Sequence, residues 1–332
     1  MAALYSESGR EPLGPFALYI LRPTWIGNRP ESARRNDTVW TAMGVHEVPI
    51  TSLRDGFVIF EFDKSTAYAG GAVPAYTLPE SRRVPEHVIN AENDRRDLGY
   101  RRLVYMNAFL AALHSAYSTI QKRGTLVQEP IDPTNYFGAE RKLDGWQIFF
   151  DQGRRVDYPA EERDVLEIVT LTHSVDVLEK FSNAIGADRS LSILSLVYIA
   201  CAQYSRHQFA SAHLIAWSVV EALLNTLWLT LQGDVDAAAG GHTKMNADRK
   251  KLLAGRDYTA SVISQILSIT GKVDDETLSR LDEARRKRNW FAHTLKPIGS
   301  TDAGNTIRLA TDMISKVASI RMTSQLGLSF WI

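Results

Sequence analysis

The chain has 332 residues, of which 45% are hydrophobic and 23% are charged, the composition of a globular protein long enough for two domains. Lysine plus arginine and aspartate plus glutamate both number 38, so the formal net charge is zero. Proteins that hold long nucleic acids over their whole surface carry a basic excess, and the composition argues against that class. Any contact with nucleic acid is therefore expected at a local basic patch.

The cysteine content and the longest apolar run bear on the compartment. Cys201 is the single cysteine, so no disulfide can form within the chain, which favours a reducing environment. The first residues lack the basic and apolar regions of a signal peptide. The longest apolar run, near residues 191–202, is shorter than the roughly 20 residues that span a bilayer. We expect a cytoplasmic protein with no membrane contact.

The first 155 residues predict a mixed domain with a small sheet. Short apolar segments separated by turn-forming residues occur at residues 16–21, 39–50 and 57–62. The last of these is rich in aromatic and β-branched residues and predicts a strand. Apolar residues recur at helical spacing over 94–121, which predicts a helix. Loop and strand character then returns, with residues 146–150 as the best strand candidate.

From residue 156 onwards the pattern is almost entirely helical. Pro159 is followed by acidic residues, an order that favours the start of a helix. Further helices are predicted at residues 188–205, 207–231, 246–270 with a break near Gly255, 275–295 and 302–323. The composition of residues 233–243 predicts a loop. The sequence thus predicts an α+β protein, with a mixed domain at residues 1–155 and a helical domain at residues 156–332, whose core spans about 188–323.

One predicted helix, residues 275–295, places polar groups beside its apolar face. At about 100° per residue, Arg288 lies only about 20° from Leu281 in the middle of that face. Asn289 lies on the flank, and His293 follows one turn later. A guanidinium in an apolar face must be paired or must line an interface or cleft. A guanidinium, an amide and an imidazole are the groups that hold a phosphate and move a proton.

These residues resemble the signature of the HEPN superfamily. The segment 288–293 (RNWFAH) has an arginine, a polar residue directly after it, and a histidine at the family's spacing. The segment 217–224 (WSVVEALL) is similar to the helix that precedes this motif in many HEPN domains. The resemblance covers roughly residues 188–323 and does not extend to the N-terminal part.

The resemblance implies a metal-independent endoribonuclease that needs no cofactor. In this chemistry the ribose 2′-hydroxyl attacks the adjacent phosphate and leaves a 2′,3′-cyclic phosphate and a 5′-hydroxyl. His293 would move the proton, Arg288 would neutralise the phosphorane oxygens, and Asn289 would orient the phosphate or the imidazole. From the helical wheel, Arg285 is expected to bind a neighbouring phosphate. Glu221 is expected to be a buried, supporting partner of an arginine.

The resemblance also implies partners. HEPN nucleases build their site across a homodimer, and the apolar flank of Arg288 suits such an interface. Many act as toxins or antiviral defence effectors, so the N-terminal domain would be a sensor or would dock a regulatory protein or ligand. Two other interpretations remain open: a catalytically silent HEPN scaffold, and a subunit of a larger RNA-guided complex.

Other patterns predict structure rather than chemistry. The tryptophans at 217 and 228 and the C-terminal segment 330–332 are expected to pack in the core or at a dimer interface. The segment 240–244 (GGHTK) lacks the ending of a phosphate-binding loop. No metal site is expected, because the short spacings of zinc ligands are missing among the scattered histidines at positions 46, 114, 173 and 242.

Overall fold

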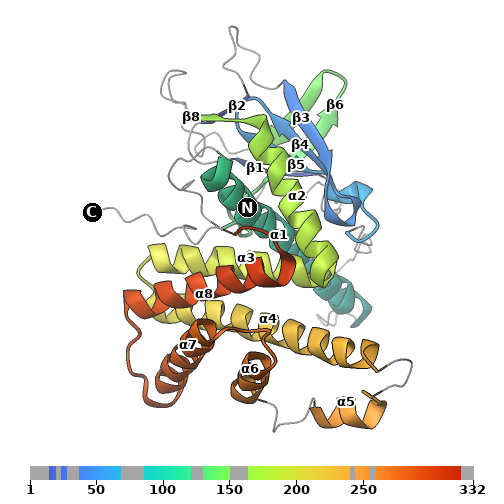
Figure 1. Cartoon of the computed structure of the whole chain (residues 1–332). Coiled ribbons are helices and arrows are strands. Elements are labelled where there is room, and N and C mark those ends of the chain that lie inside the picture. Colours follow the sequence, from blue (N-terminus) through green and yellow to red (C-terminus); the bar gives the residue numbers. More distant parts are fainter. Residues whose placement is uncertain are drawn as a thin grey trace. The chain divides into compact units, whose positions relative to one another are not determined.

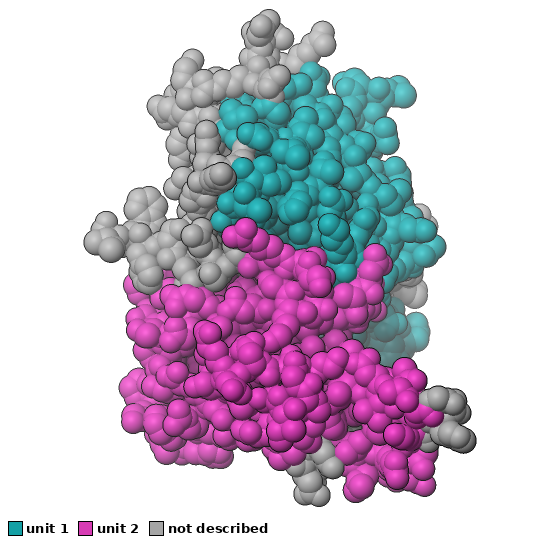
Figure 2. All heavy atoms as spheres, viewed as in Figure 1, with its two compact units in different colours: residues 1–182, 190–195 teal, residues 183–189, 196–332 magenta. Residues whose placement is uncertain are grey.

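The structure is a computed structural model that describes residues 15–19, 24–27, 37–68, 86–120, 130–149, 164–239, 244–253 and 259–322. It has an α+β fold, as predicted, and forms two compact units (Figure 2). Unit 1 comprises residues 1–182 with 190–195, and unit 2 comprises residues 183–189 with 196–332. The boundary expected near residue 155 lies outside the described residues, and the observed division comes later in the chain.

Unit 1 contains a six-stranded antiparallel sheet with the strand order β3-β4-β5-β1-β6-β7 (Figure 1). Its strands are β1 (Phe16–Tyr19), β3 (Thr38–Met43), β4 (Pro49–Leu53), β5 (Phe57–Phe60), β6 (Phe137–Lys142) and β7 (Gly145–Phe149). The strands predicted at 57–62 and 146–150 are confirmed as β5 and β7. The segment 39–50 forms most of β3 and the start of β4.

A second, two-stranded sheet pairs β2 (Thr24–Ile26) in parallel with β8 (Asp164–Leu166). Asp164, one of the acidic residues after Pro159 that were expected in the first turns of a helix, lies in this strand instead, so that prediction is wrong at Asp164. Pro159 itself lies outside the described residues. The next helix, α2 (Ile168–Ile185), begins only after this strand.

Helix α1 (Glu86–Ile120) confirms the helix predicted at 94–121 and starts earlier than expected. It packs on β5 through aromatic rings, with the Phe60 ring centroid 5.8 Å from that of Tyr105 and 5.3 Å from that of Phe109. Two short 3-10 helices lie next to strands of the sheet in sequence, Val45–Glu47 before β4 and Phe62–Lys64 after β5. The sheet and α1 thus share one buried aromatic core.

Unit 2 is helical. Its helices are α3 (Ala187–Ser205, of which residues 190–195 belong to unit 1), α4 (Phe209–Ala237), α5 (Ala247–Leu253), α6 (Ala260–Ile269), α7 (Asp275–Thr294) and α8 (Ser300–Ala318). All were predicted, and α5 and α6 correspond to the helix expected to break near Gly255. The loop expected over 233–243 is wrong at its start, because α4 continues to Ala237.

Helix α4 forms the centre of unit 2 and packs against α6, α7 and α8 (Figure 1). Val219, Val220, Leu223 and Leu224 are buried along it. Among the described helices, α4 alone is long and apolar enough to cross a membrane, although its sequence contains no unbroken apolar run of that length. Its buried side chains and its three packing partners mark it as the core helix of a bundle.

Candidate functional site

The ends of α7 fix the position of the predicted motif. At its N-terminus the Asp274 carboxylate accepts hydrogen bonds from the Thr277 backbone N–H (2.7 Å) and from Lys316 Nζ (2.8 Å). Lys316 and Thr277 hold the pKa of this carboxyl well below its usual range. At the C-terminus Leu295 adopts a left-handed conformation, and its N–H donates to the Phe291 carbonyl (3.0 Å). Both ends of the helix that carries the motif are therefore capped.

The buried face of α7 is narrower than the predicted apolar stripe. Leu281 and Ala284 are buried, and α7 packs on α4, α6 and α8. Phe291 is half-buried and Leu295 is 77% exposed. The apolar face of α7 is thus covered in the middle of the helix and open at its C-terminal end, beside the motif.

The motif residues form a polar stripe on α7. Arg285, Asn289 and His293 are spaced four residues apart, so they lie on one face of the helix. Arg285 and Asn289 are half-buried, and His293 is exposed. Arg288 is half-buried on the flank of this stripe, and its Nη1 donates to the Asn289 Oδ1 (3.0 Å). The structure therefore places a guanidinium and an amide in direct contact, one helical turn from a solvent-accessible imidazole.

Arg285 has a partner within its own helix. Its Nη2 lies 3.4 Å from the Asp282 carboxylate, while its buried Nε makes no hydrogen bond. Asp282, Arg285 and Arg286 line a shallow hollow of about 570 Å³ on the outer side of α7, together with three residues of the preceding turns. A phosphate bound by Arg285 would have to compete with the carboxylate of Asp282.

Glu221 is half-buried on α4 and forms no ion pair with any residue that the structure describes. The α7 arginines with an acidic partner bind other carboxylates: Arg280 pairs with Asp312 (2.7 Å), and Arg285 pairs with a residue of its own helix. The ion pair expected between Glu221 and an arginine is therefore not observed. The neighbouring apolar positions of the 217–224 segment are buried, as their pattern predicts.

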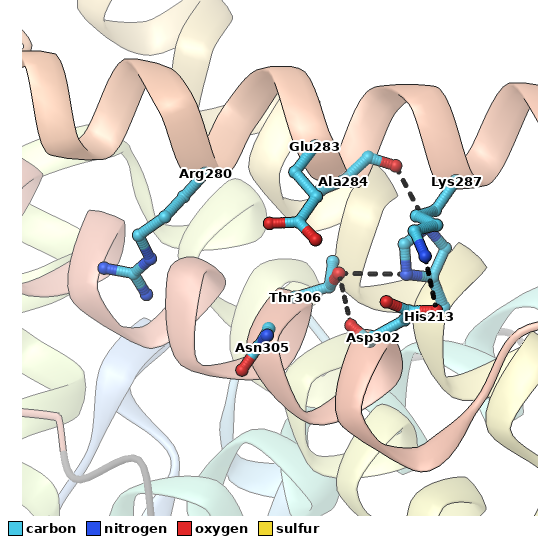
Figure 3. Close-up of a pocket in the computed structure, with 8 residues that line it drawn as sticks. All are labelled: His213, Arg280, Glu283, Ala284, Lys287, Asp302, Asn305 and Thr306. Carbon is cyan, nitrogen blue, oxygen red and sulfur yellow. Dashed lines mark hydrogen bonds and ion pairs between the residues drawn. The ribbon is translucent and has the colours of Figure 1, made fainter.

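A pocket of about 180 Å³ lies on another side of α7, facing α4 and α8 (Figure 3). Its floor is the buried His213, whose Nε2 is 3.2 Å from the Ala284 carbonyl and whose Nδ1 is 2.9 Å from the Thr306 hydroxyl. At its rim Lys287 contacts the Asp302 carboxylate (3.1 Å). These residues were not predicted as a site from the sequence, because the pocket forms only where three helices meet.

Burial lowers the pKa of His213, and nearby Lys287 lowers it further, against the opposing effect of the carbonyls of Ala284 and Asp302. A neutral ring protonated at Nε2 donates to the Ala284 carbonyl, while its Nδ1 competes with the Asp302 carbonyl (2.9 Å) for the single hydrogen of the Thr306 hydroxyl. In an α-helix the Ala284 carbonyl also accepts the backbone N–H of the residue four positions later, which is Arg288. His213 thus anchors the turn of α7 that precedes the motif.

Among the residues that the structure describes, no group of three or more histidine, cysteine, aspartate or glutamate side chains could hold a metal ion. The C-terminal segment 330–332 and His242 lie outside the described residues. Comparison of the chain with family models, with curated proteins and with solved structures found no match.

Proposed function

We propose that this chain is a metal-independent endoribonuclease of the HEPN type, which cleaves RNA to 2′,3′-cyclic phosphate and 5′-hydroxyl ends. The observation that carries the proposal is the contact between the Arg288 guanidinium and the Asn289 amide on α7, one turn before the exposed His293. A guanidinium and an amide can bind a phosphate, and an accessible imidazole can transfer a proton.

Each residue has a role in the proposed reaction. His293 accepts the proton of the 2′-hydroxyl as its oxygen attacks the phosphorus, or donates a proton to the departing 5′-oxygen. Arg288 stabilises the negative charge that develops on the non-bridging oxygens. Asn289 holds the Arg288 side chain and orients the phosphate. Arg285 binds a neighbouring phosphate after release from Asp282.

We also propose that two copies pair through the C-terminal part of α7. On the helical wheel Arg288 and His293 lie about 140° apart, on opposite sides of Asn289. One copy of α7 therefore does not direct both side chains at the same phosphate, and a second copy can supply the arginine or the histidine that the first does not. The exposed Leu295 lies about 20° from Arg288 and offers apolar surface to such a contact. By analogy with the family, the dimer would act in the cytoplasm as a toxin or antiviral effector, with unit 1 as sensor or docking module.

The test uses purified full-length protein and total RNA in excess EDTA. His293→Ala and Arg288→Ala should each lower the cleavage rate by roughly 100-fold or more, the size expected for loss of an acid–base or oxyanion-stabilising group. His87→Ala and Arg308→Ala, which remove an exposed histidine from α1 and an exposed arginine from α8, should cleave like the wild type. Equal cleavage rates for all five proteins would show that the motif is not the active site and would point to another site or to a contaminating nuclease.

A further inference from the structure

Trp290 is an exposed aromatic residue at the C-terminal end of α7. Its side chain is 44% exposed, although tryptophan is usually well buried in folded proteins. Lys296 Nζ lies 4.6 Å from the centroid of the Trp290 ring, and Lys287 Nζ lies 5.8 Å from it. Trp290 is thus an accessible indole in contact with one ammonium group that precedes it and one that follows it in sequence.

The segment around Trp290 is the local basic patch that a chain of zero net charge needs for nucleic acid. Residues 285–296 contain five basic residues and no acidic residue. Asp282 and Asp302 pair with two of the five. Those that form no ion pair with a described residue are Arg286, Arg288 and Lys296. The patch therefore keeps cationic groups available for phosphates.

Helical spacing places Trp290 beside the proposed catalytic group. His293 is three residues after Trp290 and Arg286 is four residues before it, so both are neighbours on the helix surface, with Cβ atoms about 5–6 Å apart. A base stacked on the indole would thus bring its own sugar–phosphate backbone to His293. Lys296, which lies over the Trp290 ring, would move from the ring to a flanking phosphate when the base stacks, and Arg286 would lie one helical turn before the indole.

We propose that Trp290 is a stacking site for one base of single-stranded RNA, with Arg286 and Lys296 binding the flanking phosphates. The inference rests on the proposed function and specifies the form of RNA that reaches the site. Stacking tolerates any sequence, because every base has a π face, whereas a base inside a duplex has both faces covered by its neighbours. An apolar protein partner on the same surface would have to desolvate the ammonium groups that lie beside the ring.

The test measures binding apart from cleavage. Full-length His293→Ala protein is titrated into fluorescein-labelled single-stranded RNA, and the anisotropy is followed. Adding Trp290→Ala should weaken binding roughly 5- to 150-fold, while Trp290→Phe should keep most of the affinity because phenylalanine still stacks. Tyr100→Ala, which removes another exposed aromatic side chain (65% exposed, on α1), should leave the affinity unchanged. Lys296→Ala should reduce the slope of log affinity against log salt by roughly 0.7.

Equal affinity of the parent and Trp290→Ala proteins, or equal binding of duplex and single strand, would overturn the inference. Loss of self-association in Trp290→Ala with unchanged RNA binding would also overturn it, because the residue would then be a protein contact. If the wild type cleaves RNA but binding does not depend on Trp290, the proposed stacking site is wrong and the proposed nuclease activity still stands. If binding depends on Trp290 but the wild type never cleaves RNA, the stacking site is supported and the proposed nuclease activity is wrong.

Discussion

The two side chains with the main roles in the proposed reaction, Arg288 and His293, lie on different sides of α7. Arg288 reaches Asn289 from the side that also carries the buried Leu281, and His293 stands on the opposite side in solvent. An arginine held by a neutral amide keeps its full charge, whereas one held by a carboxylate, as Arg285 is by Asp282, is partly neutralised. Arg288 is therefore the better candidate for stabilising a developing phosphorane.

In unit 1 the absence of a side chain at Gly44 has a structural reason. A Cβ atom there would fall on the Tyr105 hydroxyl and within 2.9 Å of Ile50 Cδ1. Gly44→Ala should therefore destabilise the protein by about 1–3 kcal/mol, the usual cost of overpacking a core. Urea denaturation monitored by aromatic circular dichroism, which reports on the cluster around Tyr105, measures the change.

Gly99 in α1 supplies the matched control, because a Cβ atom there meets nothing within 4 Å. Gly99→Ala should stabilise the protein by about 0.5–1 kcal/mol, because a helix interior favours alanine over glycine and the half-buried position has room for the methyl group. A Gly44→Ala protein as stable as the wild type would show that Tyr105 can move aside at no cost.

His114 links stability to pH. Its complete burial in α1 lowers its pKa to about 3, below the value of about 6.5 expected for the unfolded chain. Between these values the unfolded chain binds a proton that the folded chain does not, so stability is lost as the pH falls from about 6.5 towards 3. The loss from this residue approaches about 1.4 kcal/mol per pH unit within that window.

Urea denaturation at pH 7, 6, 5 and 4 tests this linkage. His114→Gln should be less stable than the wild type at pH 7 but should lose less stability as the pH falls. Part of the slope should remain, because burial lowers the pKa of His213 as well. Parallel pH profiles for the two proteins would mean that His114 is not the group that takes up the proton.

At the scale of elements, α7 depends on its N-terminal cap. Asp274→Ala removes the acceptor for the Thr277 N–H and the contact with Lys316, so it should cost about 1 kcal/mol. Asp274→Asn keeps an acceptor and should cost less. Because the pKa of Asp274 is lowered, its contribution is present above about pH 4 and is lost below it. Urea denaturation of the three proteins at pH 7 and pH 3 gives these differences, and equal midpoints at pH 7 would contradict the cap.

The bounds of α7 could be predicted because its end signals are local. Asp274, acidic residues in the first turn and the nearby Pro297 place both ends within one residue of the observed helix. The end of α4 could not be predicted in this way. Its last turns contain Asp234 and Asp236, which bind Lys272 Nζ (2.7 Å) and the Met245 backbone N–H (2.6 Å), and such contacts with later segments do not appear in local composition.

Other features lay beyond prediction because they join distant parts of the chain. Strand β8 was missed because its partner β2 is more than a hundred residues away in sequence, and a three-residue strand has too short a pattern to detect. The motif residues were found because they share one helix. The His213 pocket requires α4, α7 and α8 together, and the only local sign of it was a histidine within the apolar face of a helix.

At the scale of the whole molecule, zero net charge and a local basic segment describe a protein that would contact RNA at one place. Salt should therefore weaken RNA binding with a modest slope, set by the few cations of residues 285–296 rather than by the entire surface. Unit 1, with its antiparallel sheet and aromatic core, carries no part of the motif. Its proposed role is to control or deliver the activity of unit 2.

The most direct measurement is the chemistry of the ends left on RNA by wild-type protein in excess EDTA. The proposal predicts fragments with 2′,3′-cyclic phosphate and 5′-hydroxyl ends, and no cleavage where a 2′-deoxynucleotide replaces the nucleotide on the 5′ side of the cleaved bond. Mass spectrometry of the fragments identifies both features. Fragments with 3′-hydroxyl and 5′-phosphate ends, or cleavage on the 3′ side of the 2′-deoxynucleotide, would contradict the proposed attack by the 2′-hydroxyl and with it the role of His293.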